Sequence, residues 1–254
     1  MVVVCDPVNP FGTVQAREEL EALLRLSAER GIVILADTTH SAHRVDPGAE
    51  HHPIAAVAAA HPDATFLVSS GLAHGYGMAG ARVGALGGDP ALVRACLQVK
   101  IAAVRLNTNR LAQVGAAAAL RDEDWIRGGE EVIRRNLAAL RRVATPVIDP
   151  AYGFSCVVDV SGTGASAQEL TVALCRRRVA VYPGDGLGEV GATTTIRLNL
   201  SDPDPSALER FAAAYPGAVE EAASGTYREA VRDLFLSYGT DRGRRIAALV
   251  EGGG

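Results

Sequence analysis

The sequence predicts an α/β fold in which a mainly parallel sheet has helices on both faces and a smaller C-terminal α+β unit follows. Short apolar runs at 2–5 and 32–36 are separated by a longer amphipathic stretch, a pattern typical of strands buried between helices. The chain has 254 residues, of which 48% are hydrophobic. That is enough to bury one large core or two modest ones.

The expected sheet lies in the first part of the chain. Four short runs predict its strands: 2–5, 32–36, 65–69 and 82–86. A helix between the first two strands should begin at Thr13 or Gln15 and end at about Arg30. Its leucine-rich stripe predicts one buried face, and Gly31 is suited to stop it.

Helices dominate the middle of the chain. Asp89-Pro90 should start one in the N-cap and N1 positions, running to about Lys100. Two more are expected at about 108–120 and 124–144, and the second should bridge to a smaller domain.

The rest of the chain is expected to hold the following elements: strand 154–159, helix 167–178, strand 194–199, helix 205–215 and a tail helix at 227–236. These elements predict a division into four parts: residues 1–105 as a large-domain portion, 106–145 as bridging helices, 146–216 as a small domain, and 217–254 as a tail of unknown role.

Composition argues against several classes of function. The net charge of −4 gives no electrostatic case for binding nucleic acid or an acidic membrane surface. No apolar run approaches 18 residues, and the N-terminus lacks the features of a signal peptide. The four cysteines lie far apart, so we expect reduced thiols, mostly packed as small hydrophobic groups, in a cytoplasmic protein.

The most informative run is Ser69–Gly84, a glycine-rich stretch in which His74 stands eight residues before Arg82. Glycines on both sides of Arg82 favour close approach of a ligand, although an arginine on an exposed edge strand is the alternative. Lys100 is the only lysine in the chain.

Three further motifs accompany this run. Asp6–Thr13 contains an Asn-Pro loop around Asn9, and Asp37 ends an apolar strand 28 residues after Asn9. Arg197 lies in an apolar strand that follows the Gly-rich segment Pro183–Gly188. Each motif also has a purely local interpretation, because Asn-Pro and Asp are common in turns and a strand arginine can face solvent.

In this order and spacing, over residues 1 to about 215, the motifs resemble those of the fold-type I, pyridoxal-phosphate-dependent aminotransferases of class I/II. The resemblance implies that the fold is part of their large domain followed by their small C-terminal domain. It also implies that Asn9 hydrogen-bonds the phenolic oxygen of the cofactor, that Asp37 pairs with the pyridinium nitrogen, and that Arg82 binds the phosphate.

Three other residues acquire roles from the resemblance. Arg197 would bind the substrate carboxylate, which suits the bidentate geometry of a guanidinium. Ser70 would replace the family's phosphate-binding serine, whose position is taken by Gly71. His40 stands where the family commonly has a tyrosine that shares the phenolic oxygen, and an imidazole can also donate one hydrogen bond.

His74 occupies the place of the lysine that forms the internal Schiff base and shuttles the α-proton. Histidine can perform the second task but not the first. Some deoxysugar 3-dehydratases of the same fold resemble this state and bind the pyridoxamine form without a covalent bond. The resemblance therefore implies pyridoxal 5'-phosphate or pyridoxamine phosphate as a non-covalent cofactor.

The remaining histidines favour no metal site. His40 and His43 have a spacing that could place two ligands on one helical face, but no third and fourth ligands follow a zinc pattern. His51-His52 precedes a proline and is expected in an exposed loop.

Family members carry a long stretch before the Asn-Pro loop that includes a phosphate-binding helix N-terminus. This chain opens on strand 2–5, whose apolar residues are those of a strand buried on both faces. Fold-type I enzymes are generally dimers. We therefore expect a homo-oligomer or a complex with a complementary N-terminal-half polypeptide.

Three functions remain open. The chain could be a pyridoxal- or pyridoxamine-phosphate-dependent aminotransferase-like enzyme, or an enzyme component, acting on an amino acid or a related amine or keto acid. It could instead be a noncatalytic aminotransferase-fold partner or regulatory subunit. The third alternative is a truncated or decayed reading frame. The sequence does not identify a substrate.

Overall fold

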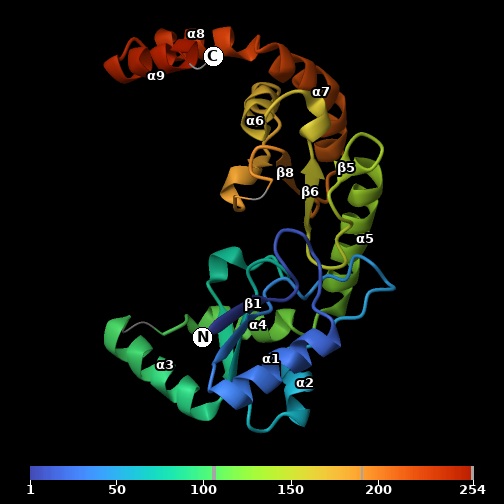
Figure 1. The fold of residues 1–254 in the computed structure, drawn as a ribbon, viewed down its shortest axis with the longest axis vertical. Coiled ribbons are helices and arrows are strands. Elements are labelled where there is room, and N and C mark those ends of the chain that lie inside the picture. Colours follow the sequence, from blue (N-terminus) through green and yellow to red (C-terminus); the bar gives the residue numbers. More distant parts are fainter. Residues whose placement is uncertain (105–106, 190, 253–254) are drawn as a thin grey trace. The chain divides into compact units, whose positions relative to one another are not determined.

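The computed structural model describes residues 1–104, 107–189 and 191–252 (Figure 1). The chain forms two compact units. The first comprises Met1–Arg135 and Ile148–Cys156, and the second comprises Asn136–Val147 and Val157–Gly254. Both units contain strands and helices, as the predicted α/β class requires.

A four-stranded sheet organises the first unit. Its strands, in spatial order, are β1 (Val2–Cys5), β2 (Ile34–Asp37), β3 (Phe66–Gly71) and β4 (Gly84–Gly88). The first three are parallel, and β4 is antiparallel to β3. The register aligns Cys5 with Asp37 and Asp37 with Ser69, so the parallel strands end at one edge of the sheet.

The core of the first unit forms where α1 (Arg17–Arg30) and the short α2 (Ile54–Val57) pack on the sheet. Leu20 and Leu24 are completely buried against the face that contains Ile34. Burying a leucine in this way contributes about 1.5–3 kcal/mol. Gly31 ends α1 in the left-handed conformation with φ 63°, as predicted.

Two strands differ from their predicted setting. β1 was expected inside a sheet, yet it lies at an edge and Val3 is 61% exposed. All five residues of β4 are exposed, so this strand is not covered on both faces either. Apolar character in a short run indicates a strand but does not determine which elements cover it.

The position of β4 is also shifted from the predicted strand at 82–86. A 3₁₀ turn, η2 (Ala79–Ala81), comes first, and Arg82 adopts the left-handed conformation with φ 53°. A residue in that conformation cannot continue an extended strand, so pairing with β3 starts at Gly84.

Three helices follow β4: α3 (Pro90–Ala103), α4 (Arg110–Ala119) and α5 (Glu123–Leu140). The Asp89 carboxylate caps α3 as predicted, accepting from Ala91 N and Leu92 N at 2.9 Å each. Asn109 caps α4 in the same way. α5 ends at Leu140, before the predicted residue 144.

The second unit is organised by another four-stranded sheet. In spatial order its strands are β5 (Thr145–Pro146), β6 (Ser155–Asp159), β8 (Thr195–Asn199) and β7 (Tyr182–Pro183). The helices are α6 (Ala167–Arg176), α7 (Pro205–Ser224), α8 (Tyr227–Ser237) and α9 (Asp241–Gly252). Short 3₁₀ turns complete the two units: η1 (Ala58–Ala60), η3 (Ser161–Thr163) and η4 (Gly184–Gly186). Strand Val157–Val158 and helix residues Leu170 and Leu174 are fully buried.

The C-terminal region contains more helix than the sequence analysis predicted. α7 continues past residue 215 through Pro216 and ends at Ser224, with Gly225 as its C-cap, and the tail forms two helices instead of one. Arg177, the C-cap residue of α6, stabilises the added turns of α7, because it donates to Gly217 O at 2.9 Å and pairs with Glu221.

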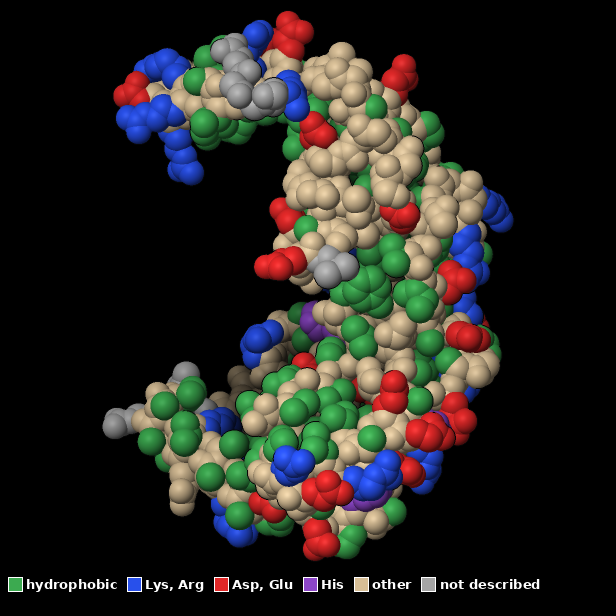
Figure 2. Space-filling view, viewed as in Figure 1, with side chains coloured by type: hydrophobic (Ala, Val, Ile, Leu, Met, Phe, Trp, Pro, Cys, Tyr) green, Lys and Arg blue, Asp and Glu red, His purple; other side chains and the backbone are tan. Residues whose placement is uncertain are grey.

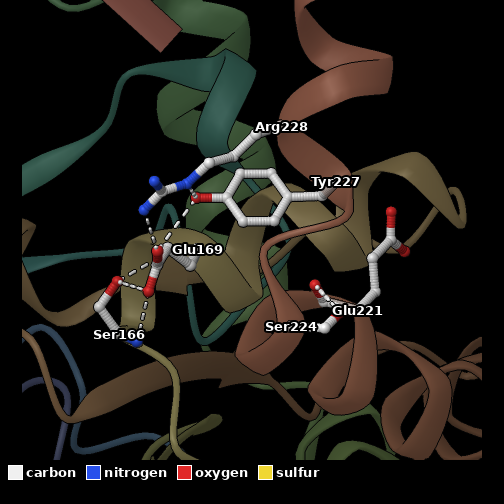
Figure 3. A network of polar contacts seen from close by, with 6 residues as sticks. All are labelled: Ser166, Glu169, Glu221, Ser224, Tyr227 and Arg228. Carbon is white, nitrogen blue, oxygen red and sulfur yellow. Dashed lines mark hydrogen bonds and ion pairs between the residues drawn. The ribbon is translucent and has the colours of Figure 1, made fainter. Parts of the chain in front are cut away.

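A polar network joins α6 to α8 (Figure 3). The Ser166 side chain caps α6, and the Glu169 carboxylate accepts a hydrogen bond from the Ser166 backbone N–H at 3.0 Å. The other oxygen of Glu169 accepts from Tyr227 Oη at 3.2 Å and from Arg228 at 3.1 Å. These bonds, led by the one from the Ser166 N–H, lower the pKa of Glu169 to about 2.

The structure describes all four cysteines, and no disulfide joins any two of them. Cys156 is buried and Cys5 is partly buried, but Cys96 and Cys175 are exposed, so the expectation of packed thiols is wrong for these two. Within the described residues, no helix combines the length and the apolar character needed to cross a membrane.

Candidate functional site

Three of the predicted site residues lie at or just after the ends of the parallel strands of the first unit. The loop containing Asn9 follows β1, Asp37 is the last residue of β2, and Ser70 lies near the end of β3. Ligands of open α/β sheets bind at this edge, because the loops after parallel strands converge there. The topology therefore brings three distant segments to one place.

The Asn9 loop is held in a defined shape. Val8 O accepts from Gly12 N at 2.6 Å, and Gly12 O accepts from Ala151 N and Tyr152 N at 3.0 Å each. A β-carbon at Gly12 would lie 2.3 Å from Tyr152 O, so only glycine allows this approach. Asn9 itself is exposed.

A buried contact joins Asp6, at the start of this loop, to His51. Asp6 is 3% exposed, and its carboxylate accepts from Gln15 N at 3.0 Å and lies 3.1 Å from His51 Nε2. The prediction that His51 lies in an exposed loop is wrong, because its side chain is only 10% exposed. The pair ties the loop after β1 to the segment before α2.

Asp37 already has one hydrogen-bonding task. Its Oδ1 atom accepts from Thr39 N at 3.0 Å and from Thr39 Oγ1 at 2.6 Å, which forms a turn after β2. The local interpretation of this aspartate is therefore realised in the structure. The same carboxylate is an acceptor suited to a pyridinium N–H.

His40 and His74 lie together although they are distant in the sequence. Their rings are stacked, with centroids 5.3 Å apart and planes inclined by 14°. Phe154 contacts both, with its centroid 5.3 Å from His40 and 5.4 Å from His74. Phe154 is buried, whereas His74 is exposed, so one face of the cluster is supported and the other is accessible.

The loop that carries His74 is closed by main-chain bonds. Leu72 N donates to Val83 O at 3.2 Å, and Met78 N donates to Leu72 O at 3.3 Å. Arg82 is exposed at the end of this loop, and its side chain donates to Ala79 O at 3.2 Å. Arg82 lies before β4, not within an edge strand.

His43 is buried behind the loop, and its ring packs against Gly129 of α5. A β-carbon on Gly129 would lie 2.6 Å from His43 Cε1. Burial lowers the pKa of His43, against the opposing effects of the Glu130 carboxylate and the carbonyls of Ile126 and Gly75. This favours a neutral ring. The residues that the structure describes contain no group of three or more His, Cys, Asp or Glu side chains suited to a metal ion.

Arg197 belongs to the second unit, where it lies on β8 opposite Tyr182 of β7. Its guanidinium carbon is 5.5 Å from the centre of the Tyr182 ring, a cation–π arrangement that orients the side chain.

Sequence reasoning missed three participants: Phe154, the Asp6–His51 pair and Tyr182. For Phe154 a signal was present, because an aromatic follows Gly153 at the start of the predicted strand 154–159. Gly153 has φ 84° and donates to His43 O at 2.9 Å, which places Phe154 beside the histidine segment. Neither composition nor spacing indicated the other two.

The chain is similar to known proteins over most of its length. The sequence model of the family "Aminotransferase class I and II" matches residues 1–214. The chain belongs to this family of aminotransferases, and its fold is a partial fold-type I arrangement.

Curated relatives include an aspartate aminotransferase of Bacillus sp. (strain YM-2), which is 29% identical over 83% of this chain and 57% of the relative. A histidinol-phosphate aminotransferase of Bacillus velezensis is also 29% identical, over 74% of this chain and 50% of the relative. The chain thus spans about half the length of the curated relatives it matches.

Solved aminotransferase structures also match most of the chain. A double mutant of Thermus thermophilus aspartate aminotransferase is 27% identical, with a TM-score of 0.69 over 84% of this chain and 56% of the other. A PLP-bound structure from Clostridium difficile 630 has a TM-score of 0.74 over 85% of this chain and 57% of the other. Its identity of 21% supports the fold alone.

Proposed function

We propose that this chain forms part of an aminotransferase-like enzyme that uses pyridoxal phosphate or pyridoxamine phosphate, bound without a covalent link, and acts on an amino acid or a related keto acid. The observation that carries the proposal is the stack of His40, His74 and Phe154 beside the ends of the parallel strands. We further propose a cytoplasmic location, in keeping with cysteines that form no disulfide.

The side chains proposed for the site offer hydrogen-bond donors and acceptors of the kinds that such a cofactor needs. Asp37 provides a carboxylate for a pyridinium nitrogen, Asn9 and His40 provide polar groups for a phenolic oxygen, and Ser70 and Arg82 provide donors for a phosphate. Each belongs to the first unit. Asn9 and His40 follow β1 and β2, Asp37 ends β2, Ser70 is the next-to-last residue of β3, and Arg82 precedes β4. The cofactor, when bound, supplies the electron sink for chemistry at the α-carbon of an amino acid.

The residues of this chain have separable tasks. His74 is exposed, and its imidazole can accept a proton from the substrate α-carbon and return it. His40 and Phe154 hold that ring from one side, which limits its orientations. Arg197 provides a guanidinium suited to a substrate carboxylate.

A noncatalytic role remains a second candidate, because histidine at position 74 cannot attach the cofactor covalently. In that role the chain is an aminotransferase-fold partner of another subunit. Binding of pyridoxamine phosphate separates the two candidates, since a partner that has lost the chemistry has no need for a cofactor.

The test combines labelling with titration. Treatment with pyridoxal phosphate and borohydride should leave no cofactor mass on the peptide spanning Gly71–Arg82, and calorimetry should detect pyridoxamine phosphate binding that weakens in Arg82→Ala. His74→Lys should gain the label on that peptide if the register is right. A stable adduct on the wild-type peptide, or no binding of pyridoxamine phosphate, would refute the proposal.

A further inference from the structure

We propose that Trp125 is a positioning residue that holds the turn Gly75–Gly77 and thereby sets the stack of His74 on His40. The assignment of a chemical role to His74 rests on the proposed function, whereas the mechanical role of Trp125 does not. Trp125 is the only tryptophan of the chain. It belongs to the first turn of α5. It lies outside the sequence motifs and is not among the residues proposed to bind the cofactor.

Trp125 contacts the turn in two ways, through a hydrogen bond and through its ring. Its indole Nε1 donates to Gly75 O at 3.1 Å. The ring also lies directly on Gly77, because a β-carbon there would be 3.0 Å from Cζ2 and 3.5 Å from Cη2. Gly77 has φ 63°, so the main chain reverses at the place where the ring covers it. The hydrogen bond to Gly75 and the ring contact with Gly77 together restrict the position of the main chain in this turn.

The segment that carries His40 also packs on the turn. A β-carbon at Gly75 would lie 2.3 Å from the Ala42 Cβ, so the main chain after His74 packs directly on the residues after His40. Gly75 is buried. The turn is therefore in contact with both Ala42 and Trp125.

This arrangement explains how an exposed histidine keeps a defined orientation. The His74 ring is stacked within 14° of parallel on His40, although His74 is exposed and lies in a loop rather than a helix or strand. Stacking alone is weak, so the main chain on the following residue must be fixed if the ring is to stay in place. Trp125 supplies that restraint from a long helix, which is a more rigid support than a loop.

Trp125 itself can be altered without opening a core. It is 53% exposed, and the buried residues of the first unit do not include it. Trp125→Phe keeps a ring over Gly77 but removes the N–H, and Trp125→Ala removes both contacts. Arg127→Ala is the matched control, because Arg127 lies on the same helix turn and its exposed side chain pairs with Glu123 and Asp124.

The primary measurement is a ¹H–¹³C spectrum of protein labelled at histidine, without any cofactor. In Trp125→Phe and Trp125→Ala the ring signals of His74 and His40, assigned with His74→Gln and His40→Gln, should shift or broaden. His61 follows η1 and should not change, so it serves as an internal reference. Pyridoxamine phosphate affinity should fall roughly twofold to tenfold in Trp125→Phe, as expected for one neutral hydrogen bond.

Unchanged His74 and His40 signals in Trp125→Ala would overturn the proposal. So would equal shifts in Arg127→Ala, which would assign the effect to the helix start, or loss of folding in Trp125→Phe, which would assign Trp125 a general structural role. If the signals move as expected while the wild type binds no pyridoxamine phosphate, the positioning role stands and the proposed function fails.

Discussion

A single carboxylate, that of Asp37, serves a local turn and is also the proposed partner of a pyridinium nitrogen. Thr39 uses the Oδ1 atom through both its N–H and its hydroxyl. An asparagine oxygen can accept the same two bonds, but it lacks the charge. The two tasks of this residue can therefore be separated by substitution.

Asp37→Ala should weaken pyridoxamine phosphate binding roughly tenfold to a hundredfold, because a charge-assisted hydrogen bond contributes about 1.5–3 kcal/mol. Asp37→Asn should retain the turn and melt close to the wild type, whereas Asp37→Ala should melt lower. Titration calorimetry and thermal unfolding measure the two effects. Equal affinities of wild type and Asp37→Ala would remove Asp37 from the site.

At the scale of elements, most helix ends follow from nearby residues, and the contacts between helices do not. The cap of α3 by Asp89 needs only the next three residues. The link between α6 and α8 instead depends on Glu169 meeting Tyr227 and Arg228, which belong to a distant part of the chain (Figure 3). Glu169 also completes the capping box with Ser166, so one side chain stabilises a helix start and a tertiary contact.

Glu169→Gln should lower the free energy of unfolding by about 1–2 kcal/mol at pH 7, since the amide keeps the capping role but loses the charge that pairs with Arg228. The pKa of Glu169 is lowered from 4.5 to about 2 in the folded protein. Its stabilisation is therefore complete above about pH 4.5 and is lost as the pH falls towards about 2.

Urea unfolding of both proteins between pH 7 and pH 2 measures this dependence. The difference between wild type and Glu169→Gln should shrink within that window, and Glu220→Gln, an exposed glutamate of α7, should show no such difference. A difference that stays constant down to pH 2 would contradict the ion-pair explanation.

For the whole molecule, the exposed apolar surface of the first unit supports association. α3 has no buried residue, and Val99 and Ile101 are 66% and 61% exposed. Leu111 of α4 is 82% exposed, and Val3 on the edge strand β1 is 61% exposed. Figure 2 shows hydrophobic side chains over the region of α3. Surfaces of this kind, beside open sheet edges, mark interaction sites.

We propose that this surface is covered in a homo-oligomer or by a complementary polypeptide. The isolated protein should self-associate at micromolar concentration in light scattering, and Ile101→Lys should reduce the association because a charge opposes burial. Leu249→Lys on α9, where Leu249 is 74% exposed, is the matched control and should change nothing. A cooperative monomer of the wild type would contradict the proposal.

The sequence by itself determined the α/β class, the stop of α1 at Gly31, the cap of α3 and the family, because these depend on hydrophobic period, capping chemistry and motif order within short stretches. Tertiary structure alone decided the edge position of β1, the left-handed Arg82 that delays β4, and the two-helix tail. It also decided the stack of His40 and His74. That contact joins segments that meet only because β2 and β3 pair in a particular register and the loops after them are packed against α5. Such a register depends on the packing of the whole sheet, and local preferences do not specify it.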